Sequence, residues 1–119
     1  MRVSAIDDPA HERTDRLFGL SADLDGRRAT LRPHGEVDIA TAPAIEQQAH
    51  ALWQEGAEEL VLDLGSVTFF DSSGLRLLIR LQTRAEAHER RALLLDDCSP
   101  AVARVLELTR LTGRFRPAG

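Results

Sequence analysis

The sequence predicts a single α/β domain in which a mixed β-sheet packs against α-helices. Three observations predict this class. Two strand-like segments joined by a tight turn come first, and strand-like segments then alternate with helical ones. Size is the third, because 119 residues can bury one core of ordinary extent but not two independent ones. The expected order is hairpin, helix, strand, helix, strand, helix and the start of a final strand.

The first two strands are expected to form a hairpin. From Phe18 onward apolar residues alternate with small or polar ones as far as Asp25-Gly26, a dipeptide typical of tight hairpin turns. The partner strand is expected at about residues 28–37. It contains Pro33, which has no N–H to donate, so this strand is predicted to lie at an edge or to carry a bulge.

A helix is expected over about residues 42–55. Thr41 can cap it, Pro43 fits its first turn, and Gly56 ends it. Its apolar residues recur at helical spacing: Ile45, Ala49, Leu52 and Trp53.

The next apolar run, Leu60–Leu64, is nearly continuous, which predicts a central strand covered on both faces. Residues 65–68 are expected to connect it to a second helix, over about residues 73–89. The apolar face of that helix is expected to comprise Leu75, Leu78, Ile79 and Gln82, widened by Leu77 and Leu81. A separate ridge at four-residue spacing carries Ser72, Arg76, Arg80 and Arg84.

The last part of the chain continues the alternation. Residues 92–95 are typical of a buried strand, and Ser99-Pro100 predicts a helix start, with an N-cap followed by proline at the first helical position. Gly113 is expected to close that helix. Alternation over residues 114–116 indicates the start of another strand.

Residues 1–16 are polar and lack periodicity, so we expect a mobile or loosely docked N-terminal arm followed by a domain over residues 17–119. The arm has no apolar run of the kind a secretory signal needs, and no stretch approaches the roughly 18 apolar residues of a membrane span. We therefore expect a cytoplasmic protein with no membrane partner. A single cysteine, Cys98, excludes an internal disulfide and a thiolate metal site, and we expect no metal and no cofactor.

The charged residues exclude several function classes. A net charge of −4 disfavours binding to phosphate backbones, so no direct nucleic-acid partner is expected. All 15 basic residues are arginine. Phosphate-binding P-loops, receiver domains, Schiff-base enzymes and lysine-dependent acyl transferases all need a lysine that this chain lacks.

The most informative segment is Phe69–Leu75, where a buried strand is expected to turn into a helix. It contains Asp71, Ser72 and Ser73, and a helix N-terminus favours added negative charge. Aspartate and serine are also ordinary helix caps, and caps alone imply no chemistry. A serine hydrolase is a remote alternative, because the pattern G-x-S-x-G is absent and the histidines are scattered: His11, His34, His50 and His88.

Three segments in order resemble the STAS domain family of bacterial anti-sigma factor antagonists. The first, Gly35–Asp38 followed by Thr41-Ala42, is similar to the segment before the family's first helix. Residues 61–64 with Asp71–Leu75 resemble its hydrophobic strand and D-S-[ST]-G signature. The third segment comprises Ser99–Val102 and residues 108–113.

The resemblance implies a regulatory binding protein with no catalytic residue of its own. In the family, the serine after the signature aspartate is phosphorylated by an anti-sigma factor that is also a serine kinase, and a separate serine phosphatase reverses this. By position that serine is Ser72. The unmodified antagonist binds the anti-sigma factor and frees the sigma factor. The expected partner-binding residues are Asp38, Ala40, Thr41, Asp71, Ser72, Ser73, Gly74, Leu75 and Arg76.

An alternative keeps the fold and changes the role: a STAS docking subunit of a lipid-transport or stress-signalling complex, without reversible phosphorylation.

Two departures from the family are expected to matter. The chain is expected to lack the family's C-terminal helix, since the sequence stops six residues after Gly113. Arg76 also stands one turn beyond Ser72, where many relatives carry a small or uncharged residue. Arg76 is expected either to pair with a phosphate on Ser72 or to remain a solvated residue of the arginine ridge.

Overall fold

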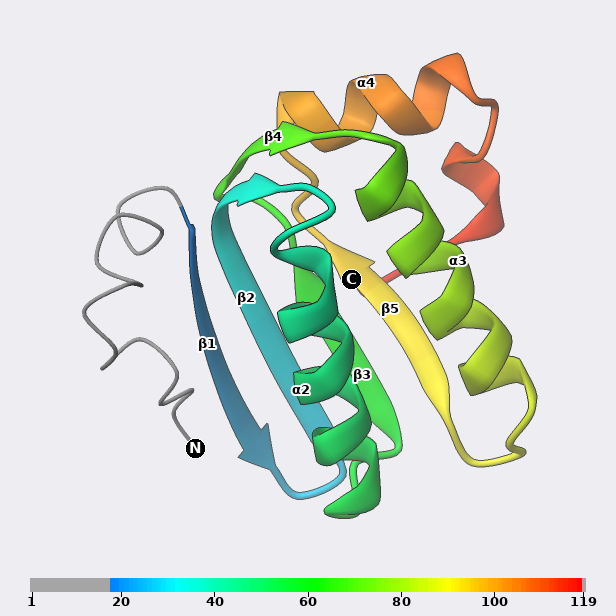
Figure 1. Ribbon diagram of the computed structural model, residues 1–119. Coiled ribbons are helices and arrows are strands. Elements are labelled where there is room, and N and C mark those ends of the chain that lie inside the picture. The colour runs from blue at the N-terminus through cyan, green and yellow to red at the C-terminus, as the bar shows by residue number, and fades with distance from the viewer. Residues whose placement is uncertain (1–17, 119) are drawn as a thin grey trace.

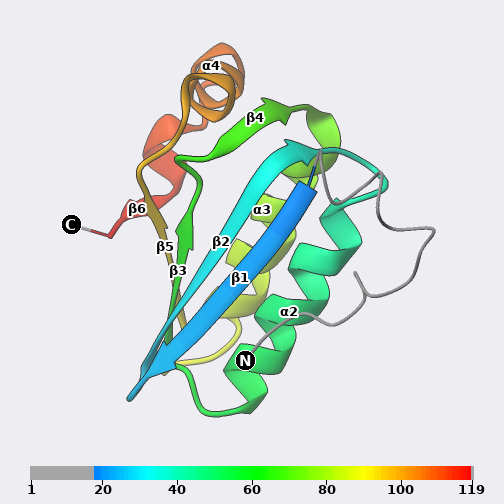
Figure 2. The same ribbon diagram turned by 90° about the vertical axis from the view of Figure 1, so that its left-hand side faces the viewer.

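The computed structural model describes residues 18–118, in which a mixed β-sheet carries two helices on one face (Figures 1 and 2). The expected N-terminal arm lies outside the described residues. The strands are β1 (Phe18–Asp25), β2 (Arg28–Val37), β3 (Glu59–Asp63), β4 (Val67–Phe70), β5 (Ala92–Asp96) and β6 (Arg116–Pro117). The helices are α2 (Ala42–Gln54), α3 (Ser72–Glu86) and α4 (Pro100–Leu108), followed by the short 3-10 helix η3 (Thr112–Arg114).

The sheet follows the order β1-β2-β3-β5-β6, and β4 is a second partner of β2. Only β1 and β2 run antiparallel, and the remaining pairs are parallel. Helices α2 and α3 lie side by side over one face, and α4 lies against β4 (Figure 1). The predicted α/β class and mixed sheet are confirmed.

The hairpin is confirmed, with Asp25 opposite Arg28 and Gly26 at a φ of 61° in the turn. The edge position predicted as one option for Pro33 is wrong, because β2 has neighbours on both sides. Residues 28–31 pair with β3, whereas residues 35–37 pair with β4. Pro33 lies where β2 changes partner, so its missing N–H falls between two ladders. A register shift does occur between Gly35 and Glu36, but its extra residue, Thr68, lies on β4 rather than on β2.

Strand β4 is missing from the sequence prediction, which treated residues 65–68 as a connection. Val67 and Phe70 are buried, while Thr68 and Phe69 between them are exposed, so the segment shows no period-two alternation over its four residues. It is a strand because the second half of β2 offers it backbone partners. The four residue types, Val, Thr, Phe and Phe, favour strands, but they do not reveal this non-local partner.

The core lies between the sheet and helices α2 and α3. The predicted inward face of α2 is confirmed, since Ile45, Ala49, Leu52 and Trp53 are all buried. In α3 the buried face is rotated from the prediction: Ile79 is 37% exposed. The buried residues of α3 are Gly74, Leu77, Leu78, Leu81 and Ala85. Each fully buried leucine contributes about 2 kcal/mol of hydrophobic free energy, which fixes this rotation.

Helix α4 begins as predicted and ends earlier. The Ser99 side chain accepts a hydrogen bond from the N–H of Val102 at 3.4 Å, and Pro100 stands in the first turn. The helix ends at Leu108 rather than near Gly113. Thr109 is its C-cap, and Arg110 takes a φ of 60° that turns the chain away. The expected final strand is present as β6, and no further helix follows it among the described residues.

Candidate functional site

The predicted site residues come together because β2 and β4 run parallel and end side by side. Val37 pairs with Phe70, and each is the last residue of its strand. The carboxyl ends of the two strands therefore meet at one edge of the sheet, and Asp38 and Asp71 follow directly (Figure 1). We call this end of the molecule the β2/β4 end. Sequence alone could not place its two segments side by side, because β4 was missed.

The loop from Asp38 to Thr41 is held by its own hydrogen bonds. The N–H groups of Ala40 and Thr41 donate to Asp38 Oδ1 at 2.9 and 3.1 Å. The Thr41 hydroxyl accepts from the N–H of Asp38 at 2.9 Å and donates to the carbonyl of Glu36 at 2.8 Å. Thr41 stands at the N-cap of α2, as predicted, but its side chain does not cap the helix. It closes the loop instead.

The start of α3 is capped by Asp71, whose Oδ1 accepts from the N–H of Ser73 at 2.9 Å. Ser72 is the first helical residue and is exposed, while Ser73 is half-buried. Among residues 18–118 no partner accepts a hydrogen bond from the Ser72 hydroxyl or donates one to it. The more accessible hydroxyl of the pair is therefore Ser72.

Gly74 allows α3 to approach β4 closely. A Cβ built on Gly74 would lie 2.7 Å from Cδ1 and 2.8 Å from Cζ of the buried Phe70 ring. These are shorter than normal van der Waals separations, so any larger residue must displace the ring. Leu75, next along the helix, is half-buried and packs against the core. Gly74 and Leu75 thus position the helix start rather than offer an exposed surface.

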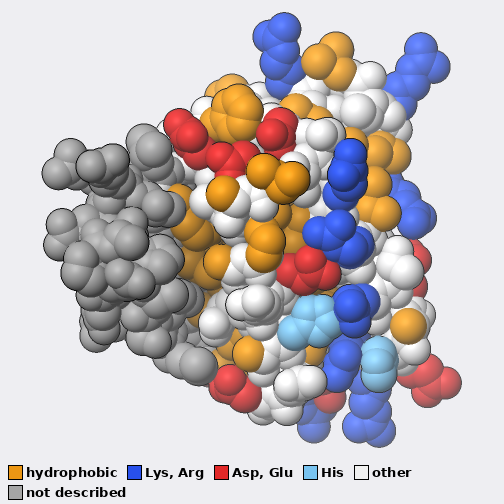
Figure 3. All heavy atoms as spheres, viewed as in Figure 1, with side chains coloured by type: hydrophobic (Ala, Val, Ile, Leu, Met, Phe, Trp, Pro, Cys, Tyr) orange, Lys and Arg blue, Asp and Glu red, His pale blue; other side chains and the backbone are white. Residues whose placement is uncertain are grey.

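Arg76 is exposed one turn after Ser72, and the ridge formed by Arg76, Arg80 and Arg84 is confirmed on the surface of α3. Figure 3 shows a column of basic side chains over this helix. Arg80 is bound to Glu46 of α2, with its Nη2 3.0 Å from Oε1. Within the part of the chain that the structure describes, Arg76 has no ion pair.

Two exposed apolar side chains at the β2/β4 end were missed by sequence reasoning. Ile39, in the loop after β2, is 80% exposed, and Phe69 of β4 is 46% exposed. Figure 3 shows apolar and acidic side chains gathered over this end. A signal for Phe69 exists in hindsight: in a strand, the neighbour of an inward Phe70 must point outward. The lone Ile39 between Asp38 and Ala40 carries no such signal.

Among residues 18–118 no hydrogen bond joins Ser72 or Ser73 to a histidine. His50 packs edge-on against Trp53, with ring centroids 6.4 Å apart, and burial together with Arg84 lowers its pKa. Cys98 is half-buried, and burial followed by the nearby Asp97 and Asp96 raises the pKa of its thiol. A protonated thiol is a poor nucleophile and metal ligand.

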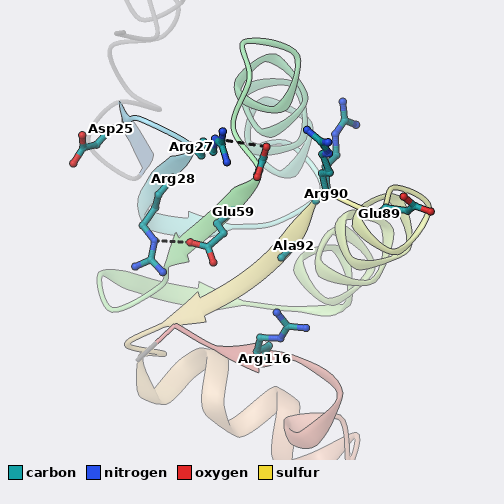
Figure 4. A pocket seen from close by; sticks show the side chains of 10 residues that line it. Asp25, Arg27, Arg28, Glu59, Glu89, Arg90, Ala92 and Arg116 are labelled. Atoms are coloured by element: carbon teal, nitrogen blue, oxygen red, sulfur yellow. Dashed lines mark hydrogen bonds and ion pairs between the residues drawn. The ribbon is translucent and has the colours of Figure 1, made fainter.

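A second charged region lies at the opposite end of the sheet, where a shallow hollow of about 650 Å³ opens (Figure 4). Arg28 Nε lies 3.0 Å from Glu59 Oε1, and Arg27 Nε lies 3.8 Å from Glu58 Oε2. The full lining is Asp25, Arg27, Arg28, Glu58, Glu59, Glu89, Arg90, Arg91, Ala92 and Arg116. We call it the arginine hollow.

The described residues give no sign of a metal centre or a membrane span. Across residues 18–118, no three histidine, cysteine, aspartate or glutamate side chains are grouped so that they could hold a metal ion. None of the described helices combines the length and the apolar character needed to cross a bilayer.

The chain is similar to proteins named as anti-sigma factor antagonists. The "Anti-sigma-B factor antagonist" of Staphylococcus aureus (strain NCTC 8325 / PS 47) is 27% identical over 77 residues, which are 65% of this chain and 70% of that protein. The crystal structure of an anti-sigma factor antagonist from Mycobacterium paratuberculosis matches with a TM-score of 0.74 and 26% identity, covering 86% of each chain.

The anti-sigma factor antagonist SpoIIAA shows the same fold in two solved forms. The unphosphorylated form matches with a TM-score of 0.68 and 24% identity over 86% of this chain and 88% of that one. The phosphorylated form matches with a TM-score of 0.64 and 22% identity over 86% and 91%. The family model described as "Mlab, STAS domain" matches residues 20–117, and the chain belongs to the STAS domain family.

Proposed function

We propose that this protein is an anti-sigma factor antagonist that binds an anti-sigma factor with serine kinase activity and so releases a sigma factor. Phosphorylation of Ser72 switches this binding off, and a serine phosphatase restores it. The observation that carries the proposal is the exposed Ser72 hydroxyl, placed beside the Asp38–Thr41 loop at the β2/β4 end. The protein is a substrate rather than an enzyme, and the exchange takes place in the cytoplasm.

The transfer step uses ATP bound by the partner kinase. Ser72 Oγ attacks the γ-phosphorus and forms the new O–P bond, the bond to the β-phosphate oxygen breaks, ADP leaves, and the hydroxyl proton passes to a base of the kinase. The phosphatase removes the group by hydrolysis: water attacks the phosphorus, the bond from phosphorus to Ser72 Oγ breaks, the oxygen of Ser72 regains a proton, and inorganic phosphate leaves. Because Ser72 is exposed and unpartnered within residues 18–118, it can enter a kinase site without unfolding α3.

The docking surface consists of Asp38, Ile39, Phe69, Asp71 and Ser72. Two acidic side chains and two exposed apolar ones suit a partner that presents a basic patch beside an apolar pocket. A phosphate adds about −1.5 to −2 charges and considerable bulk at the centre of this surface. If the partner surface that faces Ser72 is fitted to a small hydroxyl and carries acidic groups, steric conflict and repulsion of about 3 kcal/mol reduce affinity more than a hundredfold.

The first experiment incubates the protein with candidate serine kinases of its own genome and ATP, and locates the phosphate by mass spectrometry. We expect one phosphate on Ser72 and none in Ser72→Ala. Binding of the cognate anti-sigma factor is then measured by calorimetry for Ser72→Ala and Ser72→Asp. We expect Ser72→Ala to bind like the unmodified protein and Ser72→Asp to bind at least tenfold more weakly. Phosphate on another residue, or none with any kinase, rejects the switch.

The docking surface is tested separately with Ile39→Ser and Phe69→Ser. Each should weaken binding of the anti-sigma factor about tenfold, equivalent to about 1.4 kcal/mol, because an apolar contact is lost. The matched control is Leu24→Ser, since Leu24 is also partly exposed, at 39%, but lies beside the hairpin turn at the other end of the sheet. Equal losses in all three variants would show that binding does not use the β2/β4 end.

A second candidate is a docking subunit of a lipid-transport or stress-signalling complex that uses the same surface without phosphorylation. The observation that favours it is the Asp38–Thr41 loop, which is fully formed by its own hydrogen bonds and needs no modification to present Ile39. Equal affinity of Ser72→Asp and Ser72→Ala for the partner, with no phosphate acquired, supports this function over the switch.

A further inference from the structure

We propose that Arg76 binds the phosphate of phosphorylated Ser72 within the same helix and thereby holds the modified side chain in one position. The inference rests on the proposed phosphorylation and adds a positioning residue to it. Its starting point is that Ser72 and Arg76 are four residues apart on the exposed face of α3. Side chains at this spacing are neighbours, with Cβ atoms about 5–6 Å apart.

Arg76 is available for this contact, whereas the next arginine of the ridge is already paired. Two hydrogen bonds join Arg80 Nε to the Glu46 carboxylate, at 3.1 and 3.2 Å, and hold its guanidinium against α2. Arg84 stands three turns beyond Ser72. Among the described residues Arg76 has no acidic partner, so its guanidinium can turn toward Ser72 without breaking an existing pair. A planar guanidinium also matches a phosphate by donating two parallel hydrogen bonds.

The carboxylates around Ser72 favour such a cation. Asp71 precedes it, and Asp38 and Glu36 lie at the adjoining end of β2, so three carboxylates repel a new phosphate. The Asp71 carboxylate also occupies the N–H of Ser73, which removes one of the donors that the helix start could offer. Arg76 therefore supplies a full positive charge one turn from Ser72, and it directs the phosphate along α3, away from Asp71.

The test uses protein in which phosphoserine is incorporated at position 72 during synthesis, so that no kinase is required. The second pKa of the phosphate is read by ³¹P NMR titration in the parent phosphoprotein and in its Arg76→Gln and Arg84→Gln variants. We expect Arg76→Gln to raise this pKa by about 0.3, because an arginine at this spacing stabilises the dianion. Arg84→Gln is the matched control from the same ridge and should change it by less than about 0.1.

Thermal unfolding gives a second readout. The phosphorylated Arg76→Gln variant should melt below the phosphorylated parent, while the two unmodified proteins melt alike. The same phosphate pKa in all three proteins, or equal melting differences with and without phosphate, overturns the inference. Either result leaves the proposed function standing, because that depends on whether a kinase modifies Ser72. Failure of every kinase to modify Ser72 rejects the function while the ³¹P measurement remains valid.

Discussion

The two ends of the sheet are both polar, but they satisfy their polar groups in different ways. At the β2/β4 end, Asp38, Thr41 and Asp71 are hydrogen-bonded to the backbone, which leaves Ser72 and the apolar Ile39 exposed. In the arginine hollow, arginines pair with glutamates in solvent, as Arg28 does with Glu59 (Figure 4). At the β2/β4 end the hydrogen bonds fix the loop backbone and leave Ser72 and Ile39 exposed to a partner. In the arginine hollow the ion pairs neutralise charged side chains that face solvent.

This contrast indicates which of the two ends is the better candidate for a binding site. Exposed ion pairs contribute little to stability and tolerate rearrangement, so a cluster of charge is weak evidence for a site. Side chains held by backbone hydrogen bonds keep one geometry before any partner arrives. A partner that binds such a surface loses less conformational entropy on association.

The largest change in the free energy of unfolding is expected when the packing of α3 against β4, beneath the β2/β4 end, is altered. Gly74→Val should lower the free energy of unfolding by about 3 kcal/mol, because its side chain must displace the buried Phe70 ring. Urea denaturation measures the loss. The control is Gly113→Val, since a Cβ at Gly113 has no atom within 4 Å and should cost less than about 0.5 kcal/mol. Similar losses at both glycines would show that the close approach of α3 to β4 has no energetic role.

A smaller effect is expected from the hydroxyl that closes the Asp38 loop. Thr41→Val keeps the shape of the side chain but leaves the N–H of Asp38 and the carbonyl of Glu36 without their partner. The expected loss is about 2 kcal/mol in urea denaturation, with faster amide exchange at Asp38. Thr83→Val, on the exposed face of α3, serves as the control and should change stability by less than about 0.5 kcal/mol. Unchanged exchange at Asp38 would contradict the proposed rigidity.

The smallest effect is expected in the arginine hollow. Arg28→Ala should reduce stability by less than about 1 kcal/mol, because the pair with Glu59 is exposed, and the loss should shrink further in 1 M salt. Binding of the anti-sigma factor should be unchanged. A double-mutant cycle with Glu59→Gln isolates the pair energy. The contrast between the two ends would be wrong if Arg28→Ala lost more stability than Thr41→Val, or if it changed the affinity for the anti-sigma factor.

Local signals in the sequence predicted most of the fold. Asp25-Gly26 located the hairpin, and Ser99-Pro100 located the start of α4, because turn and cap chemistry acts within a few residues. The misses were non-local. Pro33 lies inside the sheet because β2 changes partner there, and β4 is a strand only because β2 pairs with it. No pattern within either segment records that pairing.

In the candidate site, too, local features were predictable from the sequence and non-local ones were not. The motif identified the residue types, and the polar segments at Asp38 and Asp71 were named before their adjacency was known. The sequence predicts that Thr41 caps α2, whereas its hydroxyl donates to the carbonyl of Glu36. A threonine at that position suits either role, so the sequence does not distinguish them. The exposure of Ile39 and Phe69 depends on how β4 sits against β2, so it required the structure. Phosphorylation of Ser72 and the partner surface remain predictions.

Because β4 pairs with β2, the number of residues in β4 determines the position of Ser72 relative to Asp38. Insertion of one residue between Val67 and Phe70 would move the chain by about 3.3 Å along the strand and turn alternate side chains to the opposite face. Phe69 would enter the core, Phe70 would point outward, and Ser72 would lose its place beside Asp38. A variant with this insertion would therefore present the motif on a different surface.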